Sequence, residues 1–157
     1  MRLLVGALAL LVMLTLSGCG ITIPTDPNGS LDRASGGTLR VGISPNGDLA
    51  VVDDSGYSGK EVDIVRGFAR SIDAEIDWTV GSEEALVRGL ETQKLDVVIG
   101  GITDQTPWTD RVGLTRPYLQ TTADDGASLS VVMLLPMGEN ALLSELETYL
   151  DSQRVDA

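Results

Sequence analysis

Apolar residues recur along most of this chain with the periods of strands and helices. Two segments alternate apolar and polar residues as half-buried strands do: Leu39, Val41 and Ile43 in the first, and Ile76, Trp78 and Val80 in the second. Trp78 is therefore expected in the core. A short strand is expected at 49–52, between two clusters of turn-forming residues. The runs at 95–99 and 130–136 are nearly all apolar, which is typical of parallel strands covered on both faces.

Three segments repeat apolar residues at helical spacing. The clearest has its apolar positions at Val62, Val65, Phe68, Ala69 and Ile72. It is predicted to run from 59 to 72 and to begin with a capping box formed by Ser58 and Glu61. A second helix is expected to begin at Glu83 and Glu84 and to bury Leu86, Leu90 and Val87. A closing helix places one stripe of residues on its inner face: Leu142, Leu143, Leu146, Tyr149 and Leu150.

Strands that alternate with helices predict an α/β fold, with a mostly parallel sheet, helices on both faces and right-handed crossovers. In such sheets ligands bind beyond the carboxyl ends of the strands. The stretch from Gly100 to Tyr118, rich in hydroxyls and turn formers, leaves one of those ends. It is therefore the candidate ligand loop.

The first residues are typical of an export signal rather than of a membrane span. Arg2 precedes a short apolar core, and residues 1–18 end in a small-residue stretch before Cys19. The segment around Cys19 resembles the lipobox of bacterial lipoproteins, which implies a lipid on that thiol and an extracytoplasmic, membrane-anchored protein. Residues 19–37, rich in Pro, Gly, Ser and Asp, are predicted to be a flexible tether.

Composition excludes several classes of function. The formal net charge is −12, and it becomes −13 once Arg2 is removed with the signal, which argues against nucleic acid and anionic headgroups as partners. The chain has no histidine, and its one cysteine is assigned to the lipid, so the usual catalytic bases and thiols are absent. No enzyme, cofactor or metal site is expected, since the Asp pairs at 53–54 and 124–125 lack the spacing of a calcium loop.

The order of several segments resembles the first lobe of bacterial extracellular solute-binding proteins of the polar amino acid class, which serve ABC importers. These segments are GTLRVGI, GYSGKEVDIVRGFA, KLDVVIGGIT and LTRPYLQT, and VVMLLPMGENALLSELETYLDS resembles the return to that lobe. The resemblance implies a single periplasmic-binding-protein-like lobe at 38–153, with a tail at 154–157. The family inserts a second lobe where this chain has only a polar connector at 119–128, so the second lobe is expected to be missing.

The resemblance also fails where the family holds its ligand. The family's loop carries an arginine that grips the ligand carboxylate, and no arginine occupies that place after Thr106 and Pro107. The aromatic clamp that follows the family's first strand is replaced by PNGD. An ordinary α-amino acid ligand is therefore doubtful.

Six residues are candidates for ligand contacts, each with a structural alternative: Thr103, Thr106, Trp108, Asp63, Arg111 and Tyr118. Thr106 either offers its hydroxyl with Thr103 or caps a helix that begins at Pro107. Trp108 either stacks on a ligand or packs in the lobe.

The other three candidates are also open to two interpretations. Asp63 either lines the cleft or is a charge in the first turns of its helix, and Arg111 either substitutes for the missing arginine or lies on the surface. Tyr118, with Arg116, either stabilises the strand-like exit of the loop or faces the cleft.

The preferred hypothesis is a lipid-anchored solute-binding protein that works with a permease, a second lobe or a second copy. A single lobe covers only part of a small ligand, so weak binding is expected without such a partner. The alternative is a ligand-free scaffold lipoprotein that uses the old cleft to bind another protein.

Overall fold

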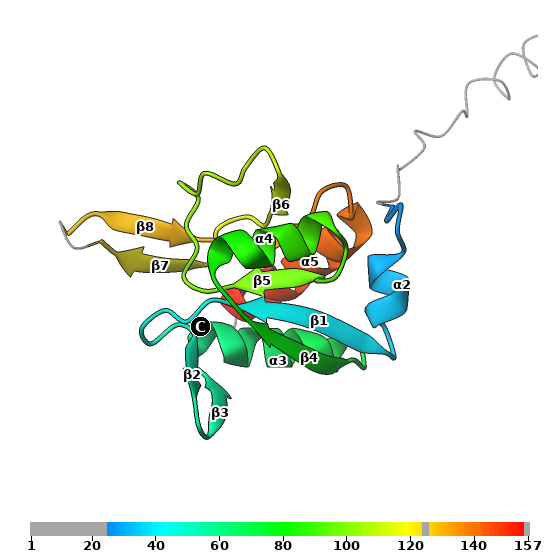
Figure 1. The fold of residues 1–157 in the computed structure, drawn as a ribbon, viewed down its shortest axis with the longest axis horizontal. Helices are drawn as coiled ribbons and strands as arrows, with labels where there is room; N and C mark the ends of the chain where they lie inside the picture. Colours follow the sequence, from blue (N-terminus) through cyan, green and yellow to red (C-terminus); the bar gives the residue numbers. More distant parts are fainter. Residues whose placement is uncertain (1–24, 124–125, 156–157) are drawn as a thin grey trace, which may run out of the picture.

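A five-stranded mixed sheet forms the centre of the protein, in a computed structural model that describes residues 25–123 and 126–155 (Figure 1). Its strands lie in the order β4 (Glu75–Val80), β1 (Thr38–Ile43), β5 (Val97–Ile99), β9 (Leu134–Pro136) and β6 (Val112–Leu114). β1 pairs in parallel with β4 and β5, which confirms the parallel centre of the sheet.

The run at 130–136 is not the parallel strand that its apolar character predicts. It is divided between β8 (Ser128–Val131), which lies outside the main sheet, and β9, which runs antiparallel to β5 and β6. The chain turns back through β7 (Leu119–Thr122) and β8 at the carboxyl end of the parallel strands. It therefore re-enters the sheet in the opposite direction.

Helices cover both faces of the sheet, as predicted. α3 (Lys60–Ser71) and α5 (Asn140–Val155) share one apolar cluster with the side chains of β1 and β5, and α4 (Glu83–Glu91) forms a second cluster on the other face. The predicted apolar stripes of α3 and α4 are buried, as are the three leucines of α5 at 142, 146 and 150. Trp78 is half-buried, stacked on Tyr57 at a centroid distance of 4.9 Å.

Two short hairpins complete the described part. β2 (Val51–Asp53) and β3 (Gly56–Ser58) form the first, close to the strand expected at 49–52. β7 and β8 form the second where a polar turn was expected, and they project from the end of the molecule opposite α2 (Ser30–Ala34) (Figure 1).

The segment assigned to a flexible tether is part of the fold from residue 25 onward, so that prediction was wrong there. Asp26 accepts backbone hydrogen bonds from Ala141 at 2.7 Å and Leu142 at 3.1 Å, which caps the start of α5. Glu139 in turn accepts from the backbone of Asn28 at 3.0 Å and Ser30 at 3.1 Å, at the start of α2. The segments that precede α2 and α5 thus cap each other's helices.

A buried carboxylate joins α2 to the sheet. Asp96 is fully buried and accepts hydrogen bonds from Arg33 at 2.6 Å and from the backbone and side chain of Arg40 at 2.6–2.9 Å. Burial opposes ionisation, but the hydrogen bonds from Arg40 and Arg33 outweigh it and lower the pKa of Asp96. These contacts hold residues 30–34 against the lobe.

The C-terminal prediction is partly covered by the structure, and the N-terminal ones are not. The predicted tail at 154–157 begins too early, because α5 extends to Val155. The signal at 1–18 and the lipid site at Cys19 lie outside the described residues. Within the part of the chain that the structure describes, no helix is long and apolar enough to cross a membrane.

Candidate functional site

The carboxyl ends of β4, β1 and β5 meet at one edge of the sheet, where Gly81, Ser44 and Gly100 follow them. The turn after β5 needs glycine twice. Gly100 and Gly101 have φ values of 149° and 66°, and a Cβ on Gly101 would lie 2.6 Å from Nδ2 of Asn46. The amide of Asn46 therefore lies over the turn, next to the end of β1.

The side chain of Glu61 binds the backbone of this turn. Its Oε2 accepts hydrogen bonds from the backbone N–H groups of Gly100 at 3.1 Å and Gly101 at 2.6 Å, and its Oε1 accepts one from the hydroxyl of Tyr118. Glu61 is completely buried and Tyr118 is nearly so. The three contacts connect the start of α3, the candidate loop and the exit of that loop.

The electrostatics of Glu61 reflect its burial. Burial raises the pKa of the Glu61 carboxyl above its ordinary value, and the hydrogen bonds from Tyr118, Gly101 and Gly100 oppose the rise. Burial, together with the adjacent Glu61, raises the pKa of Tyr118 well above its ordinary value. Tyr118 is therefore a hydrogen-bond donor at neutral pH.

The support that Glu61 gives to the candidate loop was missed by sequence reasoning, because the capping-box prediction was wrong. The cap of α3 is Gly59, with φ 115° and no side-chain hydrogen bond. The sequence did contain a signal that Glu61 is buried. Its spacing from Val65 and Phe68 puts it on the apolar face of the helix, and a side chain that caps the helix would not lie there.

The next residues of the loop are paired with β8. Thr103 forms an isolated bridge with Val131, and backbone hydrogen bonds join Asp104 N–H to Ser130 O at 2.9 Å and Val132 N–H to Ile102 O at 2.8 Å. Thr103 is half-buried beside the Gly100–Gly101 turn. Tyr118 reaches the same strand from the other side, because its N–H donates to Val131 O at 3.1 Å.

The second half of the loop is fastened to α4 instead. Trp108 donates its indole N–H to Glu83 at 3.2 Å and packs on the α4 cluster, with the Arg111 guanidinium 5.1 Å from its ring centroid. Arg111 donates two hydrogen bonds to Glu91 at 2.8 and 2.6 Å. These contacts favour the packing interpretation of Trp108 and the surface interpretation of Arg111.

Thr106 does not cap a helix, because residues 107–111 form turns, so that alternative was wrong. Its side chain is buried, and its hydroxyl has no hydrogen-bond partner among the residues that the structure describes. Asp63 lies on the exposed side of α3 and pairs with Arg66 at 3.7 Å. The structure thus connects Tyr118 to the turn through Glu61 and places Thr103 two residues after the turn, on the other side of β8. Asp63, Trp108 and Arg111 make their contacts elsewhere.

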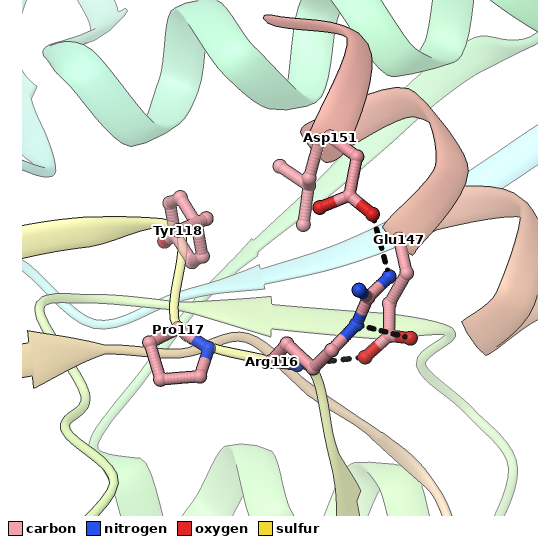
Figure 2. A pocket seen from close by; sticks show the side chains of 6 residues that line it. Arg116, Pro117, Tyr118, Glu147 and Asp151 are labelled. Carbon is pink, nitrogen blue, oxygen red and sulfur yellow. Dashed lines mark hydrogen bonds and ion pairs between the residues drawn. The ribbon is translucent and has the colours of Figure 1, made fainter. Parts of the chain in front are cut away.

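Arg116 stabilises the exit of the loop, as expected. Figure 2 shows its guanidinium bound to Glu147 at 3.0 Å and to Asp151 at 2.7 Å, with Pro117 and Tyr118 beside it. The neighbouring surface is hollowed into an open groove of about 780 Å³, whose lining consists of Arg116, Pro117, Tyr118, Leu119, Gln120 and Ser130. No cluster of side chains suited to a metal ion occurs within residues 25–123 and 126–155.

Solved structures share this architecture. The arginine-bound form of domain 1 from TmArgBP aligns with 73% of this chain and 92% of its own, at 25% identity and a TM-score of 0.65. The P235GK mutant of ArgBP from T. maritima aligns with 81% of this chain and 94% of its own, at 16% identity and a TM-score of 0.71. These alignments confirm the single periplasmic-binding-protein-like lobe.

The sequence points to the same class of protein. A probable histidine-binding protein of Campylobacter jejuni is 26% identical over 95 residues, which are 60% of this chain and 37% of that relative. The chain thus spans little more than a third of the relative's length. Residues 39–156 match the family of bacterial extracellular solute-binding proteins, family 3, and the chain belongs to that family.

Proposed function

We propose that this lobe binds a small polar solute of the amino acid class at the carboxyl ends of β4, β1 and β5. The observation that carries the proposal is the alignment with a single domain in an arginine-bound form, because that relative holds its ligand with one lobe. An open, one-sided site is therefore compatible with binding. A partner that covers the site would strengthen the binding further.

The chemistry of the site favours a solute with a positively charged group. Ser44 and Asn46, which pack against the turn, and Thr103, two residues after it, are uncharged. The charged group that contacts the turn is the buried carboxylate of Glu61. Both arginines of the candidate loop, Arg111 and Arg116, are held in ion pairs, so neither is free to grip a carboxylate.

Exposed acids lie at the same edge of the sheet. Asp48 is in the turn after β1, and Asp104 follows Thr103. Arginine and histidine, which occur in the names of the similar proteins, are therefore the first solutes to test, together with lysine and with agmatine, which is arginine without its carboxyl group.

Thermal unfolding and calorimetric titration of the chain from residue 20 onward test this function. A solute at a hundredfold its Kd stabilises the lobe by about 2.7 kcal/mol, which raises the unfolding midpoint by roughly ten degrees. Thr103→Val should weaken binding about tenfold, and Thr109→Val, an exposed threonine of the same loop, is the matched control. No shift with any cationic or neutral amino acid or amine would rule the function out.

The second candidate is a non-enzymatic interaction protein that binds no solute. The open groove beside Tyr118 and Leu119 favours it, because that groove lies on the hairpin and outside the strand ends. A lobe that unfolds cooperatively without any solute-induced shift would support this alternative.

We further propose that the protein is anchored outside the cytoplasm by a lipid on Cys19 and serves an ABC importer. The family is extracellular, and the segment around Cys19 supports the anchor. Metabolic labelling with a fatty acid should mark the wild-type protein and leave Cys19→Ala unlabelled. Labelling of both proteins, or of neither, would contradict the anchor.

A further inference from the structure

We propose that two copies of this chain associate through their β7–β8 hairpins, with the β7 strands pairing antiparallel around a two-fold axis at Thr121. The inference goes beyond solute binding and does not depend on it. It rests on the pairing of the hairpin, on its lack of charge and on the direction of its backbone groups.

The hairpin has one open edge. β7 and β8 form a two-stranded sheet of their own, and they extend away from the body of the lobe (Figure 1). The outer edge of β8 is already occupied by the loop, through the Thr103–Val131 bridge and the hydrogen bond from Asp104 N–H to Ser130 O. The outer edge of β7 pairs with no strand of the described residues.

The open edge lacks the devices that normally prevent strand pairing. Charged residues, proline and short length protect exposed edges in most proteins. The edge strand β4 carries Glu75 and Asp77, β2 carries Asp53, and β6 has only three residues. β7 and β8 each have four residues and no charge.

The negative charge of the rest of the molecule disfavours contacts between copies elsewhere than at the β7–β8 hairpin. A formal net charge of −12 makes two copies repel each other over most of their surface. The strands LQTT and SLSV allow approach without bringing like charges together. The uncharged edge of β7 is therefore the favoured contact between two copies.

The register of the hairpin defines how two β7 strands would pair. Ala123 N–H donates to Ala127 O at 2.8 Å, and alternate residues of an antiparallel ladder point their backbone groups to the same side. The backbone N–H and C=O groups of Thr121 and Leu119 consequently point toward β8. Those of Gln120 and Thr122 point to the open side of β7. The hydrogen bond that Ser130 O accepts from outside the hairpin agrees with this alternation.

Pairing Thr121 with Thr121 of the second copy aligns each Gln120 with Thr122 of the other. These residues can then exchange four backbone hydrogen bonds, and both faces of the hairpin continue across the axis. Leu119, Thr121, Leu129 and Val131 share the more buried face, so their counterparts form one continuous surface.

Sedimentation equilibrium of the chain from residue 20 onward, from about 10 µM to about 1 mM, tests the proposal. The wild-type protein should pass from monomer to dimer within that range. Thr122→Pro, which removes an outward N–H, should keep the protein monomeric, whereas Thr122→Ala, which retains it, should still dimerise. A wild-type protein that is monomeric at the highest concentration would overturn the proposal.

A charge exchange at the axis identifies the partner as a second copy. Thr121→Lys and Thr121→Glu should each be monomeric, because the axis brings like charges together. An equimolar mixture of the two variants should dimerise, which also shows that both are folded. Full dimerisation of either variant alone, or no dimer in the mixture, would contradict pairing at Thr121. Solute titration of Thr121→Lys separates this result from the proposed function, since the substituted position is outside the strand-end site.

Discussion

Replacing Glu61 tests the assignment of this buried carboxylate as the support of the candidate loop. Glu61→Ala removes the acceptor of three hydrogen bonds while leaving the donors in place: Gly100 N–H, Gly101 N–H and Tyr118 O–H. Each buried donor left without a partner costs about 1–3 kcal/mol. Gly101 is partly exposed, so its N–H regains water and contributes least.

The removal of a buried carboxylate also has a favourable component, because its desolvation is relieved. We therefore expect Glu61→Ala to lower the free energy of unfolding by about 3 kcal/mol, near the bottom of the summed range. Urea unfolding followed by the fluorescence of Trp78 and Trp108 measures this loss. Glu84→Ala, which breaks an exposed i,i+4 pair with Arg88, is the matched control and should change the midpoint little.

Glu61→Gln separates the charge from the hydrogen bonds. Its amide can accept from the two glycine N–H groups and donate to the Tyr118 oxygen, so the loss should be smaller, about 1 kcal/mol at neutral pH. Burial raises the pKa of Glu61, so its stabilising contribution is complete below the unfolded value of 4.5 and is lost as the pH rises through the folded value.

The wild-type protein should therefore lose stability relative to Glu61→Gln as the pH rises above 4.5. A Glu61→Ala variant as stable as the Glu84→Ala control would refute the supporting role of Glu61. So would a stability difference between wild type and Glu61→Gln that moves in the opposite direction with pH.

Three further substitutions test the other assignments. Asp96→Ala leaves Arg33 and Arg40 without their buried partner and should cost about 3 kcal/mol in urea unfolding. Because the pKa of Asp96 is lowered, its contribution is present above 3.8 and is lost as the pH falls through the folded value, so the variant should lack that part of the acid sensitivity. Trp108→Ala should lower the unfolding midpoint through lost packing on α4 while changing solute affinity less than about twofold; a large affinity loss at unchanged stability would restore the ligand-stacking interpretation. Asp26→Ala removes the cap of α5 and should cost about 1–2 kcal/mol by thermal unfolding, whereas Asp32→Ala, on the exposed side of α2, should cost little.

Periodicity predicted the elements whose apolar faces determine them. The alternation in β1 and β4 and the helical stripes of α3 and α4 match the structure to within one or two residues at each end. Apolar character alone does not show whether a strand runs parallel or antiparallel to its neighbours. The prediction of a parallel strand at 130–136 was therefore wrong in its direction. Its antiparallel course follows from the hairpin that returns the chain, and a short uncharged hairpin has the composition of a polar turn.

The helix α2 was not predictable from its own residues. α2 has five residues, too few to be stable as an isolated helix. Its stability comes from Glu139, more than a hundred positions away in the sequence, and from the Arg33–Asp96 contact with the sheet. A window of Pro, Gly, Ser and Asp residues therefore predicted a flexible tether.

The candidate loop is best understood as two halves with different mechanical roles. Residues 100–104 are held by Glu61 and by β8, and they lie at the strand ends where the rule for parallel sheets places a ligand. The segment from Trp108 to Arg111 is bound to Glu83 and Glu91 of α4. Both halves contain one threonine followed by one aspartate, so only tertiary contacts distinguish them. Substitutions in the first half should therefore alter solute affinity, and those in the second half should alter stability.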